Sequence, residues 1–278
     1  MAGFALCRAE VEAMDHVPPQ KLIDEIHNAS VKKAGLGVRS MLLKGWLSGA
    51  LLALSTVFAF RAFDGLSGGV AHLVAGATFP VGFAMIVLLG LELVTGNFAI
   101  LTMGVLGKKT TLPATLRNWS WVYLGNFLGS VFVGVLLAFA LTKGFLHEAG
   151  PLGEKIVEVA KSKTWAYEKD GVQGWLAALI KGVLCNWLVA LGTVLGLVSS
   201  STVGKVLAVW LPIAIFFALA LEHSVVNMFV IPTGMFLGAD ISVAQWLIWN
   251  QLPVTLGNVV GGAALTGMLL HYSHNRHP

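Results

Sequence analysis

A short polar stretch inside an apolar run constrains this chain more than any other feature of its sequence. The run from Val81 to Gly90 is almost wholly apolar, and apolar sequence resumes at Phe98. Between them, Leu91-Glu92-Leu93-Val94-Thr95-Gly96-Asn97 brings a carboxylate, a hydroxyl and an amide together. An ionisable group at membrane depth costs roughly 2.5–3.5 kcal/mol on insertion scales. Backbone that leaves a helix there must be buried in protein or line a cavity. The stretch therefore predicts a broken membrane helix beside a pathway.

The composition is that of a polytopic membrane protein. Hydrophobic residues make up 56% of the 278 residues and charged residues only 12%, whereas soluble domains carry about 25% charged residues. The net charge of +4 needs no nucleic acid to explain it, because cytoplasmic loops of membrane proteins are rich in Lys and Arg. A span needs ~20 apolar residues. Six spans fit, at about 41–60, 70–92, 119–141, 175–197, 206–221 and 246–270. The sequence therefore predicts an all-α membrane protein.

The two halves of the chain repeat each other. The break at Glu92 and Asn97 recurs at Glu222 and Asn227 with the same internal spacing. The openings of the first and fourth spans also match, at 43–47 and 180–184, as do the Leu-Gly-Asn-x-x-Gly motifs at 124–129 and 256–261. Each half holds three spans, an odd number, so the second half must insert upside down relative to the first. Inverted repeats with broken helices place a substrate site between the two breaks near the membrane midplane.

The predicted organisation has one membrane domain and two polar ends. Residues 1–34 are expected to form a cytoplasmic N-terminal segment, in which Pro18-Pro19 opens either a short amphipathic helix on the membrane surface or a solvated leader. The six-span domain covers 35–273, with repeat one at 35–141 and repeat two at 174–273, and 274–278 form a tail. Basic residues near the spans favour both termini in the cytoplasm. We therefore expect a multi-pass protein of the inner (plasma) membrane.

The polar residues of the breaks allow two interpretations. Glu92 and Glu222 can relay protons, or they can accept hydrogen bonds from backbone N–H groups and, with Asn97, hold the loops in shape. We favour the second interpretation because both glutamates recur with the loop geometry. His223 breaks the repeat symmetry, since its counterpart is Leu93. A histidine can carry or donate a proton near neutrality, and Thr95 can face it across the pathway.

Other side chains near the breaks also have two possible roles. Four phenylalanines flank the breaks, and they are either lipid-facing bulk or apolar constrictions that gate a pore by dewetting: Phe79, Phe83, Phe216 and Phe217. Four asparagines lie in the spans and breaks, and they either hold helices and loops together or contact the substrate: Asn126, Asn186, Asn227 and Asn258. The sequence has no motif for a metal, cofactor or catalytic set, which argues against an enzyme.

Four segments resemble the formate/nitrite transporter family. They are the first break, 182–189 (Gly-Val-Leu-Cys-Asn-Trp-Leu-Val), 222–232 (Glu-His-Ser-Val-Val-Asn-Met-Phe-Val-Ile-Pro) and 253–262 (Pro-Val-Thr-Leu-Gly-Asn-Val-Val-Gly-Gly). The third of these is highly specific, and together they cover most of the chain from the first span onward. The resemblance implies an aquaporin-like helical bundle with one pore per protomer, assembled as a homopentamer. It also implies substrates such as formate, nitrite or hydrosulfide, and sometimes lactate or acetate.

The resemblance implies roles for individual residues. The family's central histidine falls on His223, its loop threonine on Thr95 and the asparagine beside its pore on Asn186. We place Asn227, in the second break, on the same substrate pathway. The family's apolar constriction positions fall on Phe79, Phe83, Leu93 and Phe216. The family also has an anion-attracting lysine on the side opposite the cytoplasm. An ungapped count back from Asn186 reaches Asp170, beside Lys169 and Glu168, whereas an alignment with an insertion reaches Lys163.

These observations predict a transporter of small monovalent anions. A bare anion is poorly solvated between apolar rings, and desolvation raises the pKa of an acid. We expect a proton to join the anion near His223, so that the neutral acid passes and transport is proton-linked. The alternative is a channel for neutral solutes such as water or ammonia without proton coupling, although the Asn-Pro-Ala breaks of aquaporins are absent. The expected partners are the anion, protons and the lipid bilayer.

Overall fold

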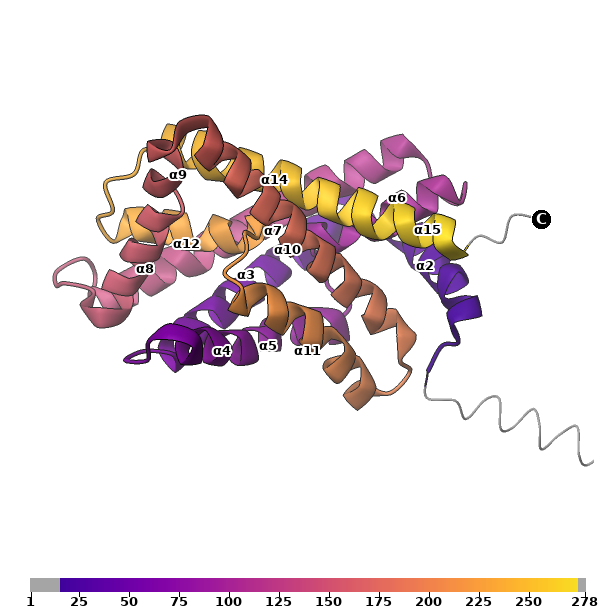
Figure 1. The fold of residues 1–278 in the computed structure, drawn as a ribbon, viewed down its shortest axis with the longest axis horizontal. Coiled ribbons are helices and arrows are strands. Elements are labelled where there is room, and N and C mark those ends of the chain that lie inside the picture. Colours follow the sequence, from indigo (N-terminus) through magenta and orange to yellow (C-terminus); the bar gives the residue numbers. More distant parts are fainter. Residues whose placement is uncertain (1–15, 275–278) are drawn as a thin grey trace, which may run out of the picture.

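The computed structural model describes residues 16–274, in which helices are joined by turns and loops (Figure 1). The β-structure of this part of the chain is limited to one isolated bridge between His16 and Ser199. Residues 1–15 of the expected N-terminal segment and residues 275–278 of the expected tail lie outside the described residues. The structure therefore confirms the all-α class. The boundaries assigned to the domain and to its two repeats stay predictions.

Five helical stretches of the described chain are long and apolar enough to cross a membrane. They are α3 (Val38–Ala62), α4 with α5 (Gly68–Thr78 and Pro80–Leu88), α7 (Leu112–Leu141), α10 (Gly171–Val198) and the last stretch, Val243–His274. A shorter apolar helix of 17 residues, α11 (Thr202–Ala218), lies where the fifth span is expected. The structure thus supports several membrane spans, while the count of six and the inverted insertion of the halves stay predictions.

The last stretch is not a uniform α-helix. It runs through α13 (Val243–Trp246), a π-helical segment (Leu247–Gln251), α14 (Leu252–Val259), a second π-helical segment (Val260–Met268) and α15 (Leu269–His274). Such π-helical segments are rare and often lie at functional sites. The matching helix of the first half, α7, is α-helical over all of its 30 residues. The two halves therefore differ in the helix that carries the Leu-Gly-Asn motif.

The structure contains both predicted helix breaks. α5 ends at Leu88 and α6 (Val94–Leu106) begins after the first break, whereas α11 ends at Ala218 and α12 (Ser224–Phe236) begins after the second. The chain turns through a left-handed residue in each, Gly90 with φ 60° and Ala220 with φ 49°. Most residues of α6 and α12 are buried. The two short helices are therefore surrounded by protein, as backbone that is broken at membrane depth requires.

Glycines bring the long helices into close contact in both halves. A Cβ on Gly129 of α7 would overlap the backbone carbonyl of Trp46 in α3. In the second half, a Cβ on Gly261 would overlap the carbonyl of Val183 in α10. Small residues permit this approach between membrane helices. The resulting crossings, α3 with α7 and α10 with the last stretch, hold the two breaks in place.

One amphipathic helix covers each short helix. α2 (Pro19–Ala34) packs on α6, where its Ile26 is buried against Ile100 and Met103. α8 (Gly150–Ser162) packs on α12, and a short helix, α9 (Trp165–Lys169), follows it. Figure 1 shows α2 beside α6 and α15, and α8 beside α12. The long polar segment before the fourth span thus contains a helix placed like α2.

Candidate functional site

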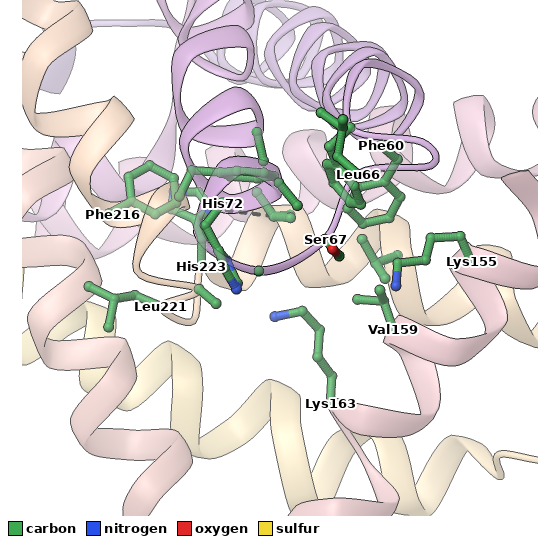
Figure 2. A pocket seen from close by; sticks show the side chains of 18 residues that line it. Phe60, Leu66, Ser67, His72, Lys155, Val159, Lys163, Phe216, Leu221 and His223 are labelled. Atoms are coloured by element: carbon green, nitrogen blue, oxygen red, sulfur yellow. Dashed lines mark hydrogen bonds between the residues drawn. The ribbon is translucent and has the colours of Figure 1, made fainter.

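Two cavities open toward the breaks from different parts of the molecule. The α8 vestibule has a volume of about 440 Å³, and its lining includes Lys163, His223 and Phe216 (Figure 2). The α2 vestibule has a volume of about 290 Å³, and its lining includes Lys33, Glu92, Leu93 and Phe83. Each vestibule therefore contains residues of one break and one lysine beside the end of an amphipathic helix. Lys33 lies in the last turn of α2, and Lys163 directly follows α8.

A hydrogen bond joins the two breaks between these vestibules. The Thr95 hydroxyl lies 3.1 Å from Nε2 of His223. Thr95 is completely buried and His223 is 2% exposed. His223 lines the α8 vestibule, and Gly96, next to Thr95, lines the α2 vestibule. The pair is therefore a polar point between the two cavities, formed by residues 128 positions apart in the chain.

A second hydrogen bond fixes the tautomer of His223. The residue is the N-cap of α12, and its Nδ1 accepts a hydrogen bond from the backbone N–H of Val226 at 3.3 Å. A neutral imidazole has one donor nitrogen and one acceptor nitrogen. The proton of the neutral ring therefore lies on Nε2, which faces Thr95. Protonation of Nδ1 would remove the cap of α12.

The glutamate of the first break is held by side chains. Nζ of Lys33 lies 2.9 Å from Oε1 of Glu92, and the amide of Asn97 donates to Oε2 at 2.7 Å. Asn97 also donates to Asn118, which donates in turn to the backbone carbonyl of Lys33. We call these four residues the α2 frame. The frame fixes the loop to α2 and α7.

The second break has an α8 frame with the same connections. Lys163 lies 2.8 Å from Glu222, and the glutamate accepts from Asn227 at 2.7 Å. Asn227 donates to Asn250, which donates to the backbone carbonyl of Lys163. In both frames the lysine precedes its glutamate by 59 residues. The α8 frame adds two hydrogen bonds to Glu222, from the Tyr167 hydroxyl at 2.8 Å and from the amide of Asn250 at 3.4 Å.

Asparagines, rather than the glutamates, bind the first backbone N–H groups of the short helices. Oδ1 of Asn126 accepts from Val94 at 3.0 Å, and Oδ1 of Asn258 accepts from Ser224 at 2.9 Å. The amide of each also donates to the carbonyl of the glutamate in its break. Asn186 donates to the carbonyls of Thr95 and Asn258. We expected the carboxylates of Glu92 and Glu222 to accept hydrogen bonds from backbone N–H groups. Instead, both carboxylates accept from side-chain donors.

The four residues at predicted constriction positions lie around this centre. Phe79 is fully buried and meets Phe216 edge to face, with ring centroids 5.5 Å apart. Phe216 in turn stacks on the His223 ring at 5.7 Å. Phe83 and Leu93 line the α2 vestibule and are also buried. Burial excludes the lipid-facing interpretation for Phe79, Phe83 and Phe216, and the stacking of Phe216 places an aromatic ring directly beside the Thr95–His223 pair.

The structure separates the candidates for the anion-attracting lysine. Lys163 lines the α8 vestibule, and its side chain extends toward His223 (Figure 2). Lys169 ends α9 and is exposed, and the carboxylate of Glu168 accepts from Gln245 at 2.7 Å. Neither Lys169 nor Glu168 lines the vestibule. The alignment with an insertion therefore selects the residue that the fold brings to His223.

Several site residues escaped the sequence analysis. They are Lys33, Asn118, Asn250 and Tyr167. A signal for the two lysines was present, because Lys33 and Lys163 precede Glu92 and Glu222 by the same number of residues. Tyr167 has no such counterpart in the first break. Burial and the neighbouring Glu222 carboxylate raise the pKa of Tyr167, so its hydroxyl stays a donor to that carboxylate.

Two broken half-helices, packed inside a shell of apolar helices and meeting between two vestibules, define a membrane transport protein or channel. The chain belongs to the formate/nitrite transporter family, because the family model described as "Formate/nitrite transporter" matches residues 20–272. Among its relatives is a "Probable formate transporter" of Methanothermobacter thermautotrophicus, which is 38% identical over 87% of this chain and 91% of the relative. The "Formate channel BtFdhC" of Bacillus thuringiensis is 35% identical over 90% of this chain and 92% of the relative.

Solved structures agree with the sequence comparison. An "FNT family ion channel" superposes with a TM-score of 0.79 at 28% identity, covering 91% of this chain and 98% of the other. A "Pentameric formate channel with formate bound" superposes with a TM-score of 0.70 at 26% identity, covering 86% and 98%. The fold of this chain is therefore that of a family whose described members are transporters and channels.

Proposed function

We propose that this protein carries formate, and related small monovalent anions such as nitrite, hydrosulfide and short monocarboxylates, across the membrane in a proton-linked manner. The observation that carries the proposal is the Thr95–His223 pair, a buried polar contact between two lysine-bearing vestibules. Phe216 stacks on His223, and we assign Phe79, Phe83, Leu93 and Phe216, which are all buried, to the constrictions. The relatives named for formate support the choice of substrate.

The first step is capture of the anion in a vestibule. The amine of Lys163 lies at the surface of the α8 vestibule, and the buried Glu222 carboxylate balances its charge from behind. Such a lysine offers N–H donors to an anion, while the neighbouring carboxylate weakens the attraction. A channel must bind its substrate firmly enough to admit it and weakly enough to release it. Lys33 and Glu92 are placed alike in the α2 vestibule.

The second step is loss of the anion's charge. Burial between aromatic rings disfavours the charged form of an acid and raises its pKa. The incoming carboxylate therefore takes a proton as it leaves the water of the vestibule for the constriction. His223 is poorly suited to supply that proton, since a cationic ring carries a proton on Nδ1 and loses the hydrogen bond from Val226. The proton comes instead from hydronium ion in the vestibule, which becomes water on transfer and is replenished from the outer solution.

The third step is passage of the neutral acid. The Nε2–H group of His223 donates a hydrogen bond to the passing acid, and the Thr95 hydroxyl can donate or accept. Without them the acid would cross the apolar constriction with no hydrogen-bond partner, at a cost of about 1–3 kcal/mol for each unsatisfied group. Asn186 holds the backbone of Thr95, and Asn227 holds the glutamate of the second break. Both asparagines thus act on the pathway through their neighbours.

The orientation and assembly are also part of the proposal. The α2 vestibule faces the cytoplasm, because basic residues gather on its side of the protein. Lys32, Lys33 and Lys44 line this vestibule, and Lys108 and Lys109 follow α6. The protein sits in the plasma membrane with both termini inside. The solved relative described as a pentameric formate channel supports assembly of this chain as a homopentamer with one pathway per protomer.

Formate uptake into proteoliposomes tests the function. The initial rate of labelled formate uptake is measured with the external pH stepped from 8 to 5, while an internal dye records proton movement. We expect uptake to rise as the outside is acidified, with protons moving in alongside formate. Formate uptake with no response to the pH gradient would refute proton linkage. Water or ammonia permeation without formate uptake would instead support the neutral-solute channel.

A further inference from the structure

The α8 vestibule is larger than a small anion requires. Its volume is about 440 Å³, against about 290 Å³ for the α2 vestibule. Cavities of about 300–1,000 Å³ enclose drug-sized organic molecules, whereas formate contains a single carbon atom. The cavity is lined by residues that include Phe63, Lys155 and His223. It can therefore hold a ligand much larger than the transported anion.

The walls of this vestibule are mainly apolar. Phe60 and Phe63 come from the end of α3, and Phe216 and Phe217 come from α11 and its end. Val159 of α8 faces the same space as Phe60, Lys155 and Lys163 (Figure 2). Aromatic walls can bury the flat or branched apolar body of a ligand, and the removal of this apolar surface from water favours binding.

The charged side chains of the vestibule are all basic. Lys155 and Lys163 line it and His72 lies on its wall, whereas no carboxylate is among the described residues that form its lining. Nζ of Lys155 lies 6.0 Å from the centre of the Phe63 ring. Its ion-pair partner, Glu158, has a side chain that is 70% exposed. Exposed pairs of this kind contribute little to stability, so the Lys155 amine can exchange its partner for another anion.

We infer that the α8 vestibule binds organic monocarboxylates with an aromatic or branched apolar body. The carboxylate lies between the amines of Lys155 and Lys163, and the apolar body covers Phe60, Phe63 and Phe217. Such an acid fills the vestibule and is too wide for the Phe79–Phe216 contact. It is therefore a ligand that blocks the pathway rather than a substrate. The blocking effect depends on the proposed transport of formate, whereas the binding site does not.

Direct binding tests the site. The purified protein in nanodiscs is titrated with 2-naphthoate by calorimetry, and empty nanodiscs correct for uptake by lipid. The uncharged 2-naphthamide has the same apolar body and serves as the ligand control. We expect the carboxylate to bind at least tenfold more tightly than the amide. Equal binding of the two compounds would overturn the role of the lysines, and no binding of either would overturn the site.

Matched variants locate the ligand. Lys155→Gln removes one amine and Phe63→Ala removes one aromatic wall, and each is expected to raise the Kd for 2-naphthoate about fivefold or more. Lys161→Gln lies on the same helix, but the amine of Lys161 lies 5.0 Å from the Trp165 ring and outside the vestibule. This control is expected to bind as the parent protein does. Size-exclusion chromatography verifies that each variant is assembled. An unchanged Kd in both test variants would exclude the vestibule as the site.

Transport measured in parallel separates this inference from the proposed function. Externally added 2-naphthoate is expected to slow formate uptake into proteoliposomes, and 2-naphthamide is not. Formate uptake without any 2-naphthoate binding would overturn the inference and leave the proposed function standing. Binding of 2-naphthoate by a protein that takes up no formate would overturn the proposed function and leave the binding site standing. Binding without any slowing of uptake would refute the blocking effect.

Discussion

The two breaks are held by equivalent frames, but the residues beside the frames differ. In both, a lysine, a glutamate and two asparagines are joined by the same hydrogen bonds. The residue after the glutamate is Leu93 in one break and His223 in the other. The second frame has an additional donor, Tyr167, and the larger vestibule. What recurs holds the backbone, and the difference between the halves lies at the Thr95–His223 contact of the proposed pathway.

Removal of a frame glutamate is expected to have the largest effect. Glu222→Ala leaves Lys163 without its carboxylate, and loss of one partner from a buried ion pair costs about 3–5 kcal/mol. Glu92→Ala should cost less, because Glu222 also accepts from Tyr167, which the first frame lacks. Thermal unfolding of the purified protein measures both. The control is Glu158→Ala, which breaks an exposed pair worth about 0–1 kcal/mol.

Two outcomes would change the comparison of the frames. If Glu92→Ala destabilises the protein more than Glu222→Ala, Tyr167 adds nothing to the second frame. If both variants unfold like Glu158→Ala, the buried pairs are not what holds the breaks, and the asparagine bonds to the backbone must do so alone.

His223→Leu makes the second break resemble the first and should abolish most transport. The pathway then lacks the Nε2–H donor. One unsatisfied hydrogen-bonding group costs about 1–3 kcal/mol, which corresponds to about a fivefold to 150-fold lower rate of formate uptake. His223→Asn separates the two roles of this residue, because asparagine is a good N-cap but lacks the Nε2–H group. It should lose uptake while it unfolds close to the parent temperature. Uptake at the parent rate in both variants would contradict the role of His223.

A smaller effect is expected from substituting the residue that has a left-handed backbone conformation in each break. Gly90 and Ala220 occupy equivalent positions with positive φ, where a Cβ costs roughly 1–2 kcal/mol. Gly90→Ala should therefore lower the free energy of unfolding by about 1 kcal/mol. Ala220→Gly should raise it by a few tenths of a kcal/mol, because the greater freedom of an unfolded glycine offsets part of the gain. The test is whether the two variants change the free energy of unfolding in opposite directions. A change in the same direction would show that the two turns are not equivalent.

The smallest predicted effect is a pH dependence confined to α2. Burial, and then the neighbouring His271 and Lys109, lower the pKa of His27 below its usual value of 6.5. Because the folded pKa is the lower one, the stabilisation is complete above about pH 6.5 and is lost as the pH falls through the folded pKa. The equivalent position in α8 is Val157. Hydrogen exchange, corrected for intrinsic rates, should show α2 opening more at pH 5.5 than at pH 7.5, while α8 does not.

The variant His27→Gln checks the cause. It should remove the difference in α2 protection between the two pH values and leave α8 as it was. If α2 keeps the full pH response without this imidazole, another group on the same face titrates instead.

The sequence predicted the parts of the site that depend on local patterns. Polar residues inside apolar runs located both breaks, and the lack of symmetry between His223 and Leu93 singled out the histidine that meets Thr95. The lysines were harder, because Lys33 and Lys163 lie in polar segments whose charges have many possible partners. Only the packing of α2 on α6 and of α8 on α12 decides which lysine reaches a glutamate. The π-helical segments follow from tertiary packing and leave no separate periodicity in the sequence.

The meeting of α6 and α12 has a consequence that involves no side-chain charge. Both short helices begin beside the Thr95–His223 contact, so the partially positive ends of two helix dipoles converge there. Each end favours a nearby negative charge by about 0.3–1 kcal/mol and disfavours a positive one. In the proposed pathway, the backbone itself therefore disfavours cations such as sodium or ammonium at the Thr95–His223 contact. A single side-chain substitution cannot remove this selectivity, because it depends on where two helices start.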